Sequence, residues 1–158
     1  MQTSVDNIYA SGDVIDKTQP KLTPTAIFES MYLTSLFSKE NSDPIDYPAI
    51  PSTVFSSPRL AQVGVKYDDA KADPDKYSIK ENHLPDDWYR QVDKQTIGDN
   101  YLIFDKNDHL VGAGEVSERA EDSINTLLPA IEFKLDSSQL GRLIYLFPSI
   151  SSATAGEL

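Results

Sequence analysis

One stretch, residues 100–116, constrains the fold more than any other part of the chain. It places two β-favouring runs, 101–104 and 109–111, on either side of the polar turn 105–108. Asn and Asp tolerate the left-handed conformation that a short hairpin turn needs. Side chains alternate between the two faces of a strand, and here both faces are apolar. The stretch therefore predicts a central hairpin that is covered on both sides.

The flanking sequence predicts helices and further strands around this hairpin. Helical spacing of apolar residues indicates four helices, at 24–39, 85–96, 117–128 and 137–147. Alternation indicates two strands, at 59–67 and 130–136, and the acidic run 68–76 is expected to be a solvated loop. We expect an α+β fold: a small, mainly antiparallel sheet around the 100–116 hairpin, packed by three to four helices.

Composition suggests how the chain is divided. Residues 1–22 are polar and are expected to form an extended arm, and residues 149–158 to form a loose polar tail. A single α+β domain would span 23–148. Within it, residues 41–58 contain four prolines, which exclude a helix or a central strand and predict an extended connector.

The sequence also predicts where one helix ends and which residues form the apolar faces of two others. Pro129 is expected to end the helix 117–128, because proline cannot donate the next helical hydrogen bond. Trp88 and Val92, with Tyr89, have the spacing of core positions on the helix 85–96. The helix 137–147 is expected to present Leu140, Leu143, Ile144 and Phe147 as its apolar face.

The totals exclude several chemistries. The chain contains no cysteine, so it offers no disulfide, thiolate nucleophile or Cys-based metal site. Its formal net charge of −11, from 25 acidic and 14 basic residues, disfavours binding to nucleic acid or to an anionic membrane. The longest uninterrupted apolar run, Leu143–Phe147, is far too short to span a membrane. No signal peptide is recognisable, so a cytoplasmic or virion location is expected.

The sequence offers few candidates for catalysis. His83 lies three residues before Asp86, and His109 follows Asp108, so either pair could act as a general base with an orienting carboxylate. Neither pair has an evident nucleophile nearby in the sequence. The acidic run 68–76 does not match a calcium-binding loop, and the glycines 112 and 114 lack the third glycine of a dinucleotide motif. No catalytic, cofactor or metal residue is therefore predicted.

The feature most typical of a binding role is the helix 24–39, whose apolar residues surround most of its circumference. We expect a protein partner, or a second copy of the chain, to contact this helix and the connector after it. The predicted partner-binding residues are Ile27, Phe28, Met31, Tyr32, Leu33, Leu36, Phe37, Tyr47, Ile50 and Phe55.

These observations predict a non-enzymatic binding or assembly subunit, such as a minor structural component of a virus-like particle. Two alternatives remain open. The charge of −11 could serve an acidic inhibitor that mimics DNA, and His83 or His109 with a neighbouring aspartate could serve a small enzyme.

Overall fold

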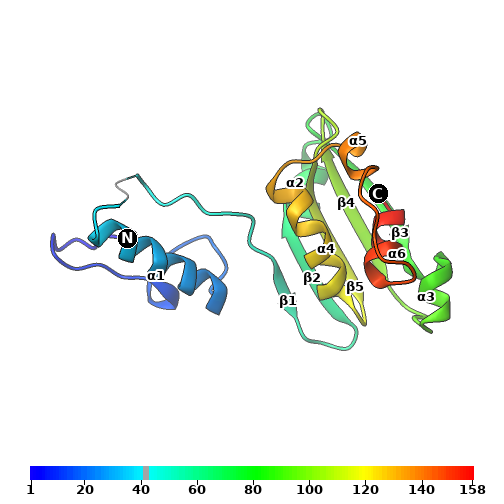
Figure 1. The fold of residues 1–158 in the computed structure, drawn as a ribbon, viewed down its shortest axis with the longest axis horizontal. Coiled ribbons are helices and arrows are strands. Elements are labelled where there is room, and N and C mark those ends of the chain that lie inside the picture. Colours follow the sequence, from blue (N-terminus) through cyan, green and yellow to red (C-terminus); the bar gives the residue numbers. More distant parts are fainter. Residues whose placement is uncertain (41–42) are drawn as a thin grey trace. The chain divides into compact units, whose positions relative to one another are not determined.

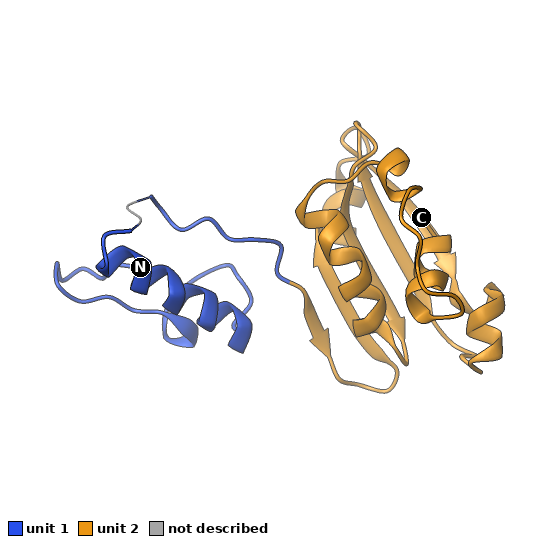
Figure 2. Ribbon diagram, in the orientation of Figure 1, with its two compact units in different colours: residues 1–50 blue, residues 51–158 orange. Residues whose placement is uncertain are grey.

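The computed structural model describes residues 1–40 and 43–158, so the first two residues of the predicted connector, 41 and 42, lie outside the described residues. The chain divides into two units, Met1–Ile50 and Pro51–Leu158 (Figure 2). This division differs from the arm, domain and tail that composition suggested. Each unit has its own internal contacts and is described by itself.

The first unit is built on one helix, α1 (Thr23–Phe37), which confirms the helix predicted from residue 24. A short 3-10 turn, η1 (Gly12–Val14), precedes it. The buried Glu29 of α1 connects the unit: its carboxylate accepts hydrogen bonds from the Gly12 amide at 2.5 Å, Lys17 Nζ at 2.5 Å and the Tyr47 hydroxyl at 2.8 Å. Segments before and after the helix are therefore fixed to one side chain.

The second unit contains a five-stranded antiparallel sheet with the strand order β1-β2-β5-β4-β3 (Figure 1). The strands are β1 (Ser52–Val54), β2 (Arg59–Gly64), β3 (Tyr77–His83), β4 (Asp99–Asp105) and β5 (Leu110–Ser117). The predicted hairpin is confirmed as β4 and β5, which are interior strands of the sheet. The expected α+β class, with a small antiparallel sheet around this hairpin, is likewise confirmed.

Two strands show how the sheet extends to its edges. β1 lies within the proline-rich connector, and its three residues pair at an edge, where proline-flanked segments are tolerated. β3 was not predicted, although it pairs with β4 along its whole length. Its sequence, YSIKENH, carries a single aliphatic residue, Ile79, so alternation gave too weak a signal.

Helices cover one face of the sheet. α4 (Ala120–Glu132) packs on β5 and β2, and α6 (Ile150–Gly156) packs on α4 and α3 (Trp88–Val92), as Figure 1 shows. Ala61 and Val63 of β2, Leu102 of β4 and Ala113 of β5 are buried beneath this layer. On the opposite face α2 (Tyr67–Ala72) brings Tyr67 against Tyr101, with the ring centroids 5.3 Å apart.

The region after residue 128 differs most from the prediction. α4 continues through Pro129 to Glu132, so the predicted stop and the predicted strand 130–136 are both wrong. Proline inside a helix removes one hydrogen bond. Here Leu127, Ala130 and Ile131 are buried on either side of Pro129, and this burial outweighs that loss.

The last third of the chain is also reorganised relative to the sequence pattern. The predicted helix 137–147 is reduced to α5 (Ser137–Leu140), which Asp136 caps by accepting from the Gln139 amide at 2.9 Å. Residues 149–158, expected as a polar tail, contain α6 with Ile150, Ala153 and Thr154 buried. Small and hydroxyl side chains let this short helix lie close to its neighbours. Composition had indicated a solvated segment.

Two shorter predictions also fail. The expected acidic loop 68–76 instead begins with the helix α2, whose Ala70 is buried. The predicted helix 85–96 is divided into the 3-10 turn η2 (Leu84–Asp86) and the five-residue α3.

Candidate functional site

The most exposed apolar surface of the second unit is the segment that joins α5 to α6. Leu143, Ile144, Leu146 and Phe147 are all exposed, Ile144 to 98% and Leu146 to 81%. Together with Trp88 of α3 they are called the apolar patch below. Residues 141–148 carry Arg142 as their single charged side chain. Several exposed apolar side chains in one short segment are typical of a protein-binding surface.

Trp88 joins this segment to α3. Its indole stacks on the Phe147 ring, with centroids 5.7 Å apart and an interplanar angle of 17°. Asp87 caps α3 by accepting from the Arg90 amide at 2.9 Å, which fixes where the helix begins. The predicted core positions Trp88 and Val92 are wrong, because both are exposed, whereas Arg90 between them is completely buried.

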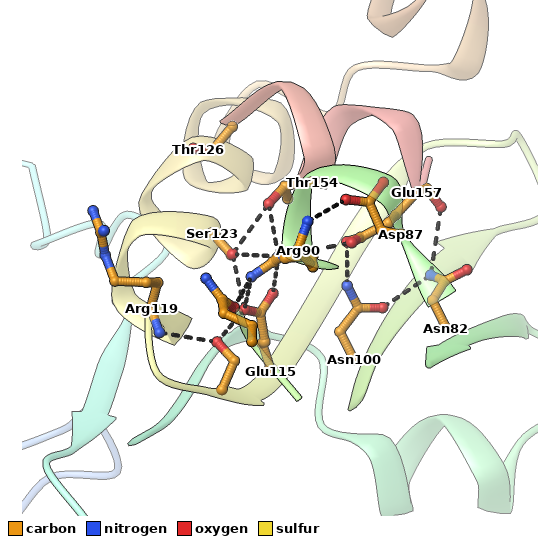
Figure 3. A network of polar contacts seen from close by, with 12 residues as sticks. Asn82, Asp87, Arg90, Asn100, Glu115, Arg119, Ser123, Thr126, Thr154 and Glu157 are labelled. Atoms are coloured by element: carbon orange, nitrogen blue, oxygen red, sulfur yellow. Dashed lines mark hydrogen bonds and ion pairs between the residues drawn. The ribbon is translucent and has the colours of Figure 1, made fainter. Parts of the chain in front are cut away.

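Arg90 is buried because it is the centre of a polar cluster beneath α6 (Figure 3). Its Nη1 and Nη2 atoms donate to the two carboxylate oxygens of Glu115 on β5, at 3.1 and 3.2 Å. Nη1 also donates to Gln95 at 3.0 Å, and Nη2 donates to Ser123 of α4 at 3.0 Å and to Thr154 of α6 at 3.3 Å. One guanidinium thus connects α3, β5, α4 and α6.

A second carboxylate, Glu157, approaches the same guanidinium from the end of α6. Its Oε1 lies 3.7 Å from Arg90 Nη2, and its Oε2 accepts from Asn100 Nδ2 at 2.5 Å. Burial raises the pKa of Glu157 to about 7, with Arg90 and Asn100 opposing the shift and the Glu115 charge adding to it. The carboxyl of Glu157 is therefore poised to exchange a proton near neutral pH.

The opposite face of the sheet carries a hollow of about 580 Å³ lined by Leu60, Tyr67, His83, Asp99, Tyr101 and Val116, among others. His83 and Asp99 are both exposed there and lie 2.8 Å apart. The hydrogen bond to Asp99 raises the pKa of His83. The structure thus pairs His83 with Asp99 rather than with Asp86.

His109 has a structural partner in the hairpin turn. Its Nδ1 lies 3.0 Å from an Asp105 carboxylate oxygen, and the other oxygen accepts from the His109 amide at 3.0 Å and the Asn107 amide at 2.8 Å. Burial alone would raise the pKa of Asp105, but these hydrogen bonds outweigh it and hold the pKa below its usual value. The pair closes the turn, and the expected Asp108 partner is replaced by Asp105.

Of the nine predicted partner-binding residues that lie in the first unit, four are exposed and five are partly buried. Ile27, Phe28, Met31 and Phe37 of α1 are exposed. Tyr32, Leu33, Leu36, Tyr47 and Ile50 are partly buried, and Phe55 of the second unit is exposed. The buried positions of α1 are instead the polar Thr25 and Glu29. Their role as a binding surface stays a prediction.

In residues 1–40 and 43–158, no group of three or more His, Asp or Glu side chains is placed to hold a metal ion. No helix in that part of the chain is long and apolar enough to cross a membrane.

Sequence reasoning missed both the apolar patch and the Arg90 cluster. The run Leu143–Phe147 is the longest apolar run, and it was interpreted as too short for a membrane span and, in part, as the apolar face of the helix 137–147. The assignment of Leu143, Ile144 and Phe147 to the apolar face of a helix hid their exposure. The Arg90 cluster gave no signal, because its members are separated by as many as 67 positions, between Arg90 and Glu157.

Comparison with known proteins shows a consistent similarity. The sequence model of the family "pyridine nucleotide-disulphide oxidoreductase, dimerisation domain" matches residues 50–157. An uncharacterised 19.7 kDa protein of the mercuric resistance operon of Staphylococcus aureus is 33% identical over 154 residues, which is 96% of this chain and 85% of that protein. A dihydrolipoyl dehydrogenase of Bacillus subtilis is 33% identical over 156 residues, covering 97% of this chain and 32% of the enzyme.

Solved structures agree in fold. LpdA from Mycobacterium tuberculosis superimposes with a TM-score of 0.85 at 20% identity, over 99% of this chain and 34% of that chain. The HOCl-induced flavoprotein disulfide reductase RclA from Escherichia coli gives 0.83 at 22% identity, over 97% of this chain and 35% of that chain. The chain therefore spans about a third of the length of the dihydrolipoyl dehydrogenases and solved reductases that it matches.

These matches correct the functional expectations. The predicted role as a virus-like-particle component and the alternative role as a DNA-mimicking inhibitor are both wrong, because the family match is to an oxidoreductase dimerisation domain. The expected virion location has no support for the same reason. The description as a non-enzymatic assembly protein is also corrected, since the relatives are oxidoreductases by name. Self-association, one of the two expected kinds of partner, is supported by the dimerisation family.

Proposed function

The chain belongs to the family of pyridine nucleotide-disulphide oxidoreductase dimerisation domains, and on that premise we propose that its second unit pairs with a second copy through the apolar patch. The observation that carries this proposal is the exposure of Ile144, Leu146 and Phe147 beside Trp88. Fully burying one such side chain stabilises an association by about 1.5–3 kcal/mol. A few of them from each copy supply the apolar centre that a pairing surface needs.

Charge supports the same surface. Two copies of a chain with a net charge of −11 repel one another, so a contact must avoid adding carboxylates to the buried area. Residues 141–148 contain none. We expect pairing to strengthen with added salt, because screening reduces the repulsion between copies while the apolar contact is retained.

The chain itself supplies no thiol, because it contains no cysteine. Disulfide chemistry of the kind named for the relatives would need sulfur from elsewhere in a larger assembly. The proposed role is therefore to bring two copies together within an oxidoreductase, and no redox step is assigned to the residues of this chain.

Sedimentation equilibrium of the full chain tests the pairing. Ile144→Asp with Leu146→Asp should weaken the dimer by at least 100-fold, because two apolar contacts per copy become buried charges. Val14→Asp changes an exposed apolar residue of the first unit in the same way and should leave the dimer intact. Circular dichroism checks that each variant is folded. A wild-type monomer at all accessible concentrations, or equal weakening by Val14→Asp, would refute the proposal.

The first unit provides a second proposed contact. We propose that α1, with its exposed Ile27, Met31 and Phe37, binds other polypeptide of the same oxidoreductase assembly. The matches to dihydrolipoyl dehydrogenase and LpdA include the first unit, and those chains are about three times as long. Deuterium uptake by α1 should fall when such a partner polypeptide is present. Unchanged uptake in a demonstrated complex would remove this contact.

A further inference from the structure

Glu157 is a second carboxylate at a guanidinium that is already paired. Both oxygens of Glu115 accept from Arg90, whereas Glu157 Oε1 lies 3.7 Å from Nη2 and has no hydrogen-bond partner. Arg90 is the one cation that the described residues place within ion-pair distance of either carboxylate. With both carboxylates ionised, the cluster would hold one uncompensated negative charge in a site where Glu157 is 8% exposed.

The remaining groups around Glu157 do not compensate that charge. From α3 the Asp87 carboxylate adds to the negative potential. From β4 the Asn100 amide donates to Oε2, and from β3 the Asn82 amide lies 3.5 Å from the Glu157 carbonyl oxygen. Lys80, also on β3, donates to the carbonyl oxygen of Leu158 at 2.8 Å. On the α4 and α6 sides the cluster presents the neutral hydroxyls of Ser123 and Thr154.

The protonated form of Glu157 removes this excess charge. Burial, the Glu115 charge and Asp87 raise the pKa of Glu157 to about 7, against the opposing effects of Arg90 and Asn100. Transfer of one proton from water to the carboxylate balances the buried charges of Arg90 and Glu115. No other group has to change its state.

The position of Glu157 links this proton to the apolar patch. Glu157 is the C-cap of the seven-residue α6, and Thr154 of the same helix contacts the guanidinium. At the other end of α6 its N-cap, Ser149, follows Phe147 and Pro148 directly. The helix therefore lies between the carboxyl that takes the proton and the patch residue that stacks on Trp88.

We propose that proton binding by Glu157 seats α6 against the sheet, and that loss of the proton loosens α6 and the apolar patch attached to it. The effect on pairing rests on the proposed function, whereas the effect on α6 does not. The structure thus contains a pH-sensitive device behind its candidate pairing surface.

The direction in which pH changes the seating of α6 follows from proton linkage. Between pH 4.5, the ordinary value for a glutamate, and about 7, the seated form holds a proton that the released form has lost. Seating is therefore strongest at the acidic end of this window and weakens as the pH rises through it. The seating equilibrium constant can change by at most about 300-fold. Each pH unit contributes at most a factor of ten, and the window from 4.5 to about 7 spans about 2.5 units.

Trp88 is the single tryptophan of the chain and reports on Phe147 directly. We expect its emission in the full chain to change as the pH rises from 5 to 8, and the transition to disappear in Glu157→Gln, which keeps the uncharged form. Glu118→Gln makes the same substitution at an exposed position outside the cluster and should retain the transition. An unchanged transition in Glu157→Gln, or none in wild type, would overturn the proposal.

Two further measurements separate the parts of the proposal. The ¹³C shift of the Glu157 carboxyl in wild type should titrate near pH 7, which needs no variant to fold; a midpoint near 4.5 would overturn the device. The dimer dissociation constant should rise at least tenfold from pH 5.5 to 8 in wild type and much less in Glu157→Gln. A dimer that is insensitive to pH would show that the proton on Glu157 is not coupled to pairing. The absence of any dimer would refute the pairing. In either case the Trp88 emission still decides whether the proton seats α6.

Discussion

Removing the Arg90 side chain should be among the most destabilising single substitutions in the second unit. Arg90→Met keeps an unbranched apolar side chain of similar length but deletes the guanidinium that pairs with Glu115 and faces Glu157. Two buried carboxylates would then have no cation, and Gln95, Ser123 and Thr154 would each lose a donor. The physical cost is that of leaving buried charge unpaired.

The expected loss in the free energy of unfolding follows from these unpaired buried carboxylates. Breaking a buried ion pair by removing one partner costs about 3–5 kcal/mol, which is a large share of the roughly 5–15 kcal/mol that stabilises a typical domain. Arg59→Met provides the matched control, because Arg59 pairs with Glu121 at a partly exposed site. Partly exposed pairs contribute about 0–1 kcal/mol. The two arginines should therefore differ by at least about 2 kcal/mol.

Urea unfolding followed by circular dichroism and by Trp88 emission measures both free energies. Runs at several protein concentrations separate unfolding of the unit from dissociation of any dimer. Arg90→Met with Glu115→Gln should recover part of the loss, since one unpaired charge has been removed. A loss below about 1 kcal/mol for Arg90→Met, equal to that of Arg59→Met, would refute the view that the cluster is a buried charge network.

Three other predictions concern single positions. Gly64→Ala should cost more than about 1 kcal/mol in urea unfolding, because Gly64 has φ +74° and a methyl group there would collide with the Val111 carbonyl oxygen; Gly156→Ala, which meets open space, should cost little. Ser149→Ala should lower stability by about 1 kcal/mol through loss of the α6 cap, and an unchanged thermal midpoint would contradict the cap. Burial alone would raise the pKa of Glu29, but hydrogen bonds from Lys17, Gly12 and Tyr47 hold it below its usual value, so the first unit should lose stability as the pH falls below about 4.5. Glu29→Gln should flatten that acid loss in a pH series of amide exchange, and an identical profile would contradict it.

The proposed pairing surface shows why an apolar sequence pattern does not by itself locate a contact surface. Apolar residues around α1 suggested a contact helix, and four of them, Ile27, Phe28, Met31 and Phe37, are exposed within the first unit. Three residues of the exposed run 143–147, Leu143, Ile144 and Phe147, were assigned to the apolar face of a helix that ends seven residues earlier than expected. Hydrophobicity alone cannot distinguish a core position from a contact position, because both favour the same side chains.

The sequence by itself determined the elements that short-range physics controls. The hairpin β4–β5 follows from two β-favouring runs around a turn rich in Asp and Asn, and α1 follows from the helical spacing of apolar residues in 24–39. The net charge and the absence of cysteine likewise limit the chemistry of the chain whatever its fold.

Only the tertiary structure decided the rest. β3 exists because β4 offers a free edge to a weakly patterned segment, and α4 passes Pro129 because its last turn is buried. Arg90 points inward because Glu115, Ser123 and Thr154, distant in sequence, converge on one point beneath α6. Long-range burial and charge pairing outweigh local propensities of about 1 kcal/mol per residue, so these features could not be read from any local window.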